Sequence, residues 1–311
     1  MDTDFLDWAL TDFSGYVAAD ELYDGPFCIL SIVDNRRYKR LLYDVLDHAP
    51  DHDDIRAFLG RLKTALIARD LTLLGITTDG SSLSPTPLAE VFSGVPHQLC
   101  QFHIVKDIIK AVVGVVSSER KRLAAKQPTL RRGRPSTPVA KQAARTKKRL
   151  EAQRAALFTH RYLFVQRHVS KTERKILWRI TRGLPHVYVL RVLMDQVYAL
   201  FDRRCRTQTA LDKLAKLRRR LLRCTQVGET LKKLFSPTLE KALTFLDDKL
   251  LPSTSNAVER GNRRYRKMQK SVYRVRTQAQ IQSRLALDMW REAQAEGRQQ
   301  TLAALHRARA G

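Results

Sequence analysis

Apolar and β-branched residues gather in short runs over the first part of the chain, with polar turns between them. Residues 16–22, 27–33 and 39–46 form such runs, and residues 34–36 form a polar turn between the second and the third. Runs of this length and composition, bounded by turn residues, are typical of β-strands. Because the connections are short, the pattern predicts an antiparallel meander of three strands.

A helical spacing replaces the strand pattern after residue 50. Residues 51–67 begin with acidic residues that suit a helix N-terminus, and their apolar positions recur every three or four residues. The apolar run at 71–78 predicts another strand. Residues 84–92 predict a short helix opened by proline, 96–100 a brief strand and 103–116 a helix. The order β-β-β-α-β-α-β-α predicts an α/β fold.

The composition changes at residue 117. Residues 117–154 hold 13 basic and 2 acidic side chains, with glycine and prolines in the middle, and helical patterns then continue to residue 250. We therefore expect residues 1–116 to form the first part of an α/β core and 117–250 a basic, all-α insertion. Residues 251–294 would be closing helices of the core, and 295–311 a C-terminal tail.

The charge is strongly positive and unevenly distributed. The net charge is +26, and residues 1–116 hold 10 basic and 17 acidic side chains, so the excess of basic residues lies in the rest of the chain. Such a surface attracts a polyanion, for which nucleic acid is the natural candidate. A membrane is disfavoured because no long apolar run or amphipathic anchor is present. On charge alone, a globular domain with a basic tail is an equal alternative.

Neither the cysteines nor the N-terminal residues indicate export. The four cysteines, Cys28, Cys100, Cys205 and Cys224, include no C-x-x-C pair, and the first twenty residues are acidic rather than basic and then apolar. Reduced thiols and the absence of a signal-peptide pattern favour a cytoplasmic protein.

Three acidic residues stand out by their positions. Asp20 lies in the first predicted strand, Asp79 at the end of a later strand, and Glu259 is the only acid between residues 248 and 288. Carboxylates from two strands and a helix can hold two Mg²⁺ or Mn²⁺ ions, which activate an oxygen nucleophile and stabilise the leaving oxygen of a phosphodiester. Glu21 and Asp24 are close rivals of Asp20. Asp79 could instead belong to a plain turn, and Glu259 could be a solvated helix acid.

Polar and basic residues near these acids are candidates for DNA contact. Glu259, Asn262, Arg263 and Arg266 recur at helical spacing on one face. Residues 131–135 resemble an AT-hook core, which can enter a minor groove, although generic phosphate contact is the commoner use of such a loop. The predicted DNA-binding residues are Arg131, Arg132, Arg134, Asn256, Asn262, Arg263, Arg264 and Arg266.

Three motifs together resemble those of DDE-type transposases, in the group of Mutator-like and related prokaryotic insertion-sequence enzymes. Residues 20–23 resemble the start of the catalytic core, and 78–80 followed by 100–103 resemble the second Asp and its C-x-x-H signature. Residues 256–264 are similar to the N-x-x-E-x-x-N-R stretch around the last Glu. The order and the spacing of the motifs also agree with the family, over roughly residues 14–290.

The resemblance implies an RNase H-like core, with three antiparallel strands, parallel strands and flanking helices, that is interrupted by a large all-α insertion. It implies Asp20, Asp79 and Glu259 as catalytic metal ligands, with Cys100 and His103 as accessory residues. On chemistry alone, a packing Cys and a His at a helix start are favoured over a zinc site, because two partner ligands are missing. It further implies double-stranded DNA as substrate, both transposon ends and target, and a homodimer or larger assembly near the nucleoid of a prokaryote.

The chain departs from the family pattern at its beginning, and two other functions remain open. Relatives usually carry an N-terminal DNA-binding domain, so we expect either a missing domain or a separate DNA-binding polypeptide. The first alternative function is a non-catalytic DNA-binding protein derived from a transposase. The second is another RNase H-like nuclease, such as a junction resolvase.

Overall fold

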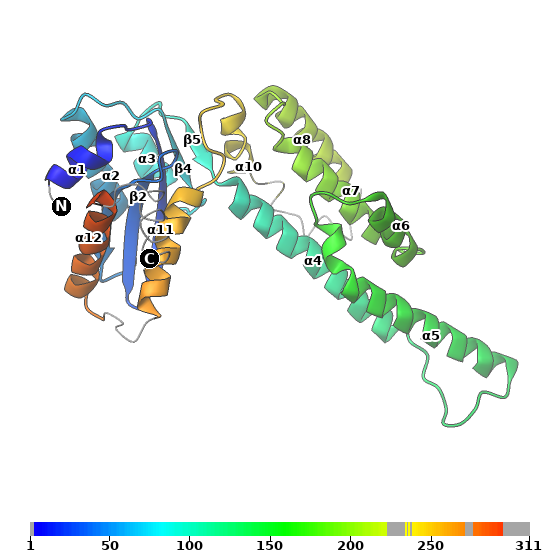
Figure 1. Ribbon diagram of the computed structural model, residues 1–311. Helices are drawn as coiled ribbons and strands as arrows, with labels where there is room; N and C mark the ends of the chain where they lie inside the picture. Colours follow the sequence, from blue (N-terminus) through cyan, green and yellow to red (C-terminus); the bar gives the residue numbers. More distant parts are fainter. Residues whose placement is uncertain (1–2, 223–233, 235, 237, 271–275, 295–311) are drawn as a thin grey trace, which may run out of the picture. The chain divides into compact units, whose positions relative to one another are not determined.

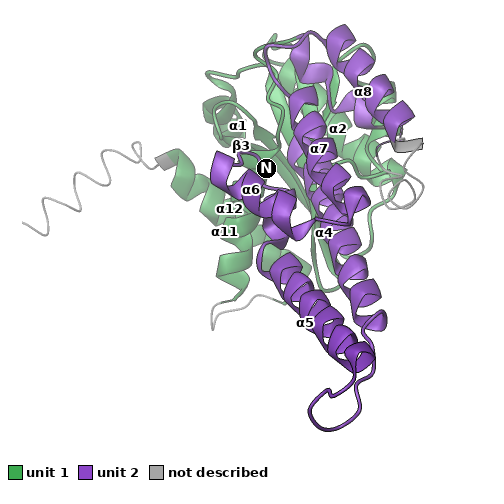
Figure 2. Cartoon of the chain, turned by 90° about the vertical axis from the view of Figure 1, so that its right-hand side faces the viewer, with its two compact units in different colours: residues 1–100, 248–311 green, residues 101–247 purple. Residues whose placement is uncertain are grey.

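A computed structural model describes residues 3–222, 234, 236, 238–270 and 276–294. The chain forms two compact units: residues 1–100 together with 248–311, and residues 101–247 (Figure 2). The predicted change at residue 117 falls inside a helix, α4 (Gln101–Ala125), which begins directly after the first unit. The predicted tail, residues 295–311, lies outside the described residues.

The first unit is built on a mixed five-stranded sheet in the order β3-β2-β1-β4-β5 (Figure 1). The pairs β1–β2 and β2–β3 are antiparallel, whereas β1–β4 and β4–β5 are parallel. The α/β class, with an antiparallel meander joined to parallel strands, is therefore confirmed. The strands are β1 (Tyr16–Asp24), β2 (Phe27–Asp34), β3 (Arg40–Leu46), β4 (Gly75–Thr78) and β5 (His97–Leu99).

Strand β4 is shorter than the apolar run that predicted it. The run begins at residue 71, but the backbone amides of Leu74 and Gly75 both donate to the carbonyl oxygen of Gly15. These residues therefore join the loop before β1, and the parallel pairing starts only at Tyr16 opposite Gly75. An apolar pattern alone does not distinguish a paired residue from one that packs beside the sheet.

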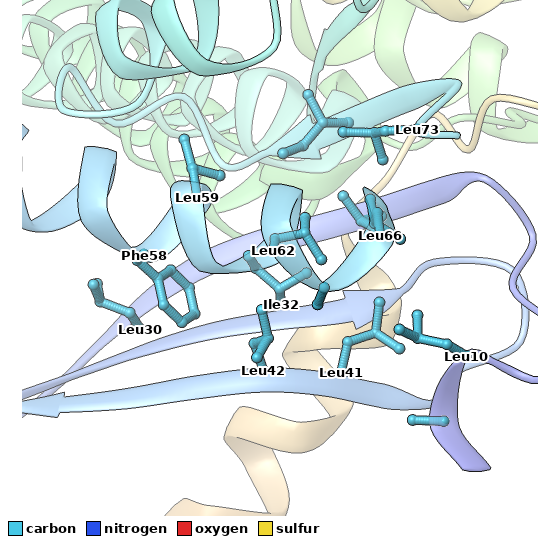
Figure 3. Packing of buried hydrophobic residues seen from close by; sticks show 14 of the residues in the cluster. Leu10, Leu30, Ile32, Leu41, Leu42, Phe58, Leu59, Leu62, Leu66 and Leu73 are labelled. Carbon is cyan, nitrogen blue, oxygen red and sulfur yellow. The ribbon is translucent and has the colours of Figure 1, made fainter. Parts of the chain in front are cut away.

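Helices cover both faces of this sheet (Figure 1). Helix α2 begins with a capping box in which Asp51 and Asp54 satisfy each other's backbone amides. Its apolar side packs on one face of the sheet in a cluster of buried hydrophobic residues (Figure 3). Helix α1 was not predicted, because its apolar residues occupy barely two turns. The helices of this unit are α1 (Thr3–Leu10), α2 (His52–Ile67), α3 (Pro85–Val91), α11 (Asn256–Gln269) and α12 (Gln278–Gln294).

Ion pairs join the two last helices to the edge of the sheet. Arg40 of β3 lies 2.8 Å from the carboxylate of Asp288 and 2.7 Å from that of Glu292, both on α12. Arg264 of α11 lies 2.6 Å from Asp288 as well. The Arg40 side chain is only 11% exposed, so the central cation of this network is largely shielded from water. It joins β3, α11 and α12.

The regular elements among the described residues of the second unit are all helices. Its buried Arg191 donates to the backbone carbonyls of Leu163, Phe164 and Gln166 and pairs with Asp195, and this holds the centre of the unit together. Part of the helical pattern predicted up to residue 250 lies outside the described residues. The helices are α4, α5 (Pro138–Thr159), η1 (Arg161–Phe164), α6 (Lys171–Ile180), α7 (Pro185–Leu200), α8 (Thr207–Leu222), α10 (Thr238–Lys241) and η3 (Thr244–Leu246). Among the described residues, every helix is too short or too polar to cross a membrane.

Candidate functional site

The end of strand β4 opens a gap beside strand β1. The two strands pair only from Tyr16 to Ala18, and β1 continues to Asp24 without that neighbour. After β4 the chain turns away at Asp79, helped by Gly80, whose φ of 99° suits glycine. The carboxylate of Asp79 accepts a hydrogen bond of 2.8 Å from the backbone amide of Ser81, which fixes the turn.

Three carboxylates meet at this gap. Asp20, Glu21 and Asp79 each offer an oxygen atom, and these oxygens lie within 4.8 Å of one another. A small cavity of about 20 Å³ lies here, with Asp20, Glu21, Thr78 and Ser84 among its lining residues. That volume is room for one particle of the size of water.

Glu21 is the acid that the sequence did not single out. Alternation along a strand places neighbouring side chains on opposite faces, so Glu21 counted only as a rival of Asp20. Because β1 has no parallel partner at this point, both carboxylates reach the open end of β4 and approach Asp79. The signal that the sequence offered for Glu21 was its position directly after Asp20 in a predicted strand.

The surroundings of Glu21 disfavour the ionised form of its side chain. Burial raises the pKa of Glu21 to about 7, and the negative charge of Asp79 adds to the rise. Hydrogen bonding to the hydroxyls of Ser84 and Ser81 opposes it. Within the described part of the chain, no lysine or arginine forms an ion pair with Glu21 or Asp79. A bound cation would supply the missing positive charge.

Helix α11 packs against strand β1 on the face of the sheet opposite helix α2. The side-chain amide of Asn262, which is 3% exposed, donates to the Asp20 carboxylate over 2.6 Å. Further along the helix, the hydroxyl of Tyr265 and the amide of Gln269 each donate to Asp24 over 2.7 Å. These three residues recur at the spacing of a helical stripe, so α11 lies along β1 with a fixed register.

The segment that leads into α11 is held against the sheet by hydrogen bonds. The hydroxyl of Tyr16 donates to Asp248 over 2.6 Å, and the hydroxyl of Thr77 donates to the carbonyl oxygen of Pro252 over 3.0 Å. The buried sulfur of Cys100 accepts a hydrogen bond from the backbone amide of Ser255, the residue before the first turn of α11. Cys100 therefore helps to position the start of α11, which is a packing role of the kind expected from its chemistry.

The structure brings together two of the three predicted acids. Asp20 and Asp79 belong to the carboxylate group, whereas Glu259 is not a member of it. Glu259 lies one turn before Asn262 on α11, its side chain is 29% exposed, and its carboxylate is 3.9 Å from the guanidinium of Arg266. The helix that carries Glu259 is thus anchored to Asp20 through Asn262.

The predicted DNA-binding residues divide into exposed and engaged side chains. Asn262 was expected to contact phosphate, but it is buried and donates to Asp20, so it serves the acidic site instead. Arg264 is half-exposed and forms an ion pair with Asp288. His103 lies in the first turn of α4, in the second unit. The residues that remain exposed are Asn256, Arg263 and Arg266 on α11, and Arg131, Arg132 and Arg134 in the loop between α4 and α5 (Figure 1).

The donor set determines which metal the group would suit. Three carboxylates offer only hard oxygen ligands, which Mg²⁺ and Mn²⁺ accept and which differ from the sulfur and nitrogen ligands typical of zinc. Comparisons with family models, curated proteins and solved structures give no match to this chain. Function is therefore inferred from the site itself.

Proposed function

We propose that this chain is the catalytic region of a DDE-type DNA transposase with an RNase H-like core. The sheet supports the proposal, because three antiparallel strands followed by two parallel ones are what the resemblance implies. The helical unit, residues 101–247, would then be the all-α insertion, since in the sequence it lies between the strands of the sheet and the helix that carries Glu259.

The observation that carries the proposal is the meeting of Asp20 and Asp79. These residues are 59 positions apart in the sequence, yet their carboxylate oxygens lie within 4.8 Å of each other at the end of a parallel strand. Such strand ends are where open α/β sheets place their sites. Asn262 then connects the third motif, residues 256–264, to the same place by its hydrogen bond to Asp20.

The acidic residues would hold Mg²⁺ or Mn²⁺ ions, and each neighbouring residue has a supporting part. When bound, two such ions activate the attacking oxygen and stabilise the leaving oxygen of a phosphodiester. Asp20 and Asp79 are the ligands, and Asn262 keeps Asp20 oriented. Glu21 supplies a third carboxylate in the present arrangement, while Glu259 is one turn of α11 away from Asn262.

The proposed reaction has two steps at phosphorus. Water attacks a phosphodiester at the transposon end, the P–O3′ bond breaks, and a 3′-hydroxyl and a 5′-phosphate are released. The 3′-hydroxyl then attacks a phosphodiester of target DNA, which forms a new bond and releases a target 3′-hydroxyl. The basic part of the chain, with 47 of the 57 lysines and arginines after residue 116, would hold the DNA during both steps.

The test measures metal-dependent cleavage and joining by the full chain. The substrate is duplex DNA that carries the natural flanks of the coding sequence, and the reactions contain Mg²⁺, Mn²⁺ or EDTA. We expect cleavage only with a divalent ion, and a loss of at least about a hundredfold in Asp79→Asn. Asp70→Asn, an exposed residue whose φ of 52° also suits asparagine, is the matched control and should cleave normally.

Two further variants ask which acid completes the site. Glu259→Gln should lose cleavage if α11 contributes a ligand, and Glu21→Gln should lose it if the arrangement described above is the active one. Full cleavage by Asp79→Asn would refute the proposal. Metal-independent binding without any cleavage would favour a DNA-binding protein derived from a transposase, and cleavage of branched DNA without joining would favour a resolvase.

A further inference from the structure

A groove in the helical unit has an apolar floor and a basic rim. It runs between the last turns of α4, the helix α5 and the connection from α6 to α7, and its volume is about 1000 Å³. Helices α4, α5 and α6 belong to the same unit (Figure 2). The floor consists of four buried residues, Leu123, Leu150, Ile180 and Leu184. The rim consists of four exposed basic residues, Lys126, Arg149, Arg179 and Arg182.

The positive charge of this rim is not compensated. No aspartate or glutamate is found among the described residues that line the groove, and the four rim residues form no ion pair within the described part of the chain. Elsewhere in the unit, arginines do find acids, as Arg122 does with Glu119 and Arg218 with Glu240. Like charges that converge on one groove repel one another, and a bound anion relieves that repulsion.

The walls of the groove are fixed before any ligand binds. The side-chain amide of Gln153 on α5 donates to the backbone carbonyls of Ile180 over 3.0 Å and Arg182 over 3.1 Å. These two hydrogen bonds tie α5 to the end of α6, and they hold the backbone that carries two of the rim cations. A preformed site loses less conformational entropy when it binds its ligand.

We propose that this groove binds the phosphate backbone of a single DNA strand. Its volume is at the upper end of small-molecule pockets, so it can hold a few nucleotides of one strand but not a double helix. The rim cations would contact phosphates, and the apolar floor would face sugars and bases. The inference deepens the proposed function and rests on it for the choice of DNA.

The test compares two pairs of arginines in the full chain. Arg179→Ala/Arg182→Ala removes two rim charges, and Arg219→Ala/Arg220→Ala removes two exposed charges of α8 that lie outside the groove. The probe is a fluorescent oligothymidylate of about 12 nucleotides, a length within the usual range of single-strand sites. Anisotropy is measured in EDTA at several salt concentrations, with the same sequence as a duplex in a parallel series.

We expect the groove variant to bind the single strand about tenfold or more weakly, with a salt slope smaller by about 1.4, the value for two lost phosphate contacts. The α8 variant should stay within about twofold of the wild type, and Arg179→Lys/Arg182→Lys should recover most of the loss. Circular dichroism checks that the helices are intact. Equal losses in both alanine variants would mean that only the net charge of the chain matters, and this would overturn the proposal. A loss of binding confined to the duplex would overturn it as well.

The outcome is separable from that of the proposed function. Binding in EDTA requires no bound metal ion, so it is measured independently of cleavage. If cleavage fails in every condition but the groove variant still loses binding, the catalytic proposal falls and the groove remains. If cleavage succeeds and the groove variant binds normally, the groove proposal falls alone.

Discussion

Replacing Glu21 by glutamine should make the first unit more stable at neutral and alkaline pH. The carboxylate of Glu21 is partly buried beside Asp79, and no described lysine or arginine pairs with it. Burial, assisted by the charge of Asp79, raises its pKa from 4.5 to about 7. The neutral amide of glutamine has nearly the same shape and removes the unfavourable charge.

The size of the effect follows from the pKa shift. One pKa unit corresponds to about 1.4 kcal/mol, so the full rise from 4.5 to about 7 sets an upper bound of about 3.5 kcal/mol. Because Glu21 is still partly exposed to water, we expect about 1 to 2 kcal/mol. The folded state holds the Glu21 proton more tightly than the unfolded state. The contribution of Glu21 to stability is therefore greatest below pH 4.5 and falls as the pH rises towards 7, whereas the variant should lack this decline.

The measurement is urea unfolding, followed by tryptophan fluorescence between about pH 4 and 8 in EDTA. Trp8 and Trp290 pack against the core of the first unit, and Trp178 is an exposed residue of the second. Working in a Trp178→Phe background makes the signal specific to the unit that contains Glu21. The difference between this background and the same protein with Glu21→Gln isolates one carboxylate from all other titrating groups.

Parallel pH profiles for the two proteins would refute this reasoning, because they would mean that the folded chain does not perturb Glu21. A steeper decline in the variant would contradict the sign. Addition of Mn²⁺ at pH 8 should stabilise the wild type more than the variant, because the ion compensates the negative charge of Glu21, which the variant lacks. Equal stabilisation of the two proteins would mean that Glu21 does not bind the ion, and it would not contradict the raised pKa of Glu21.

Two more substitutions test how the site is positioned. Gly75→Ala should lower the free energy of unfolding by about 1 to 3 kcal/mol, because the new Cβ would lie 2.7 Å from Leu251 and 3.1 Å from the ring of Tyr16. Gly60→Ala on α2, where the new Cβ would meet no side chain and no other segment within 4 Å, should stabilise by about 0.5 to 1 kcal/mol. Equal urea midpoints for the two alanine variants would contradict both expectations. Asn262→Ala should cost about 1.5 to 3 kcal/mol and abolish metal-dependent cleavage by releasing Asp20. Tyr265→Phe is the control on the same helix, because it removes a hydrogen bond to Asp24 of β1; it should lose stability but keep cleavage. Loss of cleavage in both variants would show that the effect of Asn262→Ala is merely structural.

Local patterns were sufficient for the elements of the first unit. The apolar runs at 16–22, 27–33 and 39–46 became β1, β2 and β3 with ends shifted by at most two residues, because strand composition and turn residues act over short distances. The positions of Asp20 in a strand and Asp79 after one followed from the same patterns. The basic composition after residue 116 was equally evident, although α4 crosses the point where it begins.

The acidic group itself required the tertiary structure. Alternation along β1 separates Glu21 from Asp20, and only the early end of β4 lets both approach Asp79. Asn262 was expected to face DNA, since helical spacing groups residues on a face but does not say what that face contacts. Its buried hydrogen bond to Asp20 joins residues 242 positions apart, and no local pattern reports a contact at that distance.

Secondary structure, charge and two of the acids were thus encoded within windows of a few residues. Other features depend on which distant segments pack together. These are the approach of Glu21 to the other two acids, the contact of Cys100 with α11, and the groove between α4, α5 and α6, whose rim cations form no ion pair among the described residues. That packing is decided by burial and hydrogen bonding summed over the whole unit, which no short stretch of sequence contains.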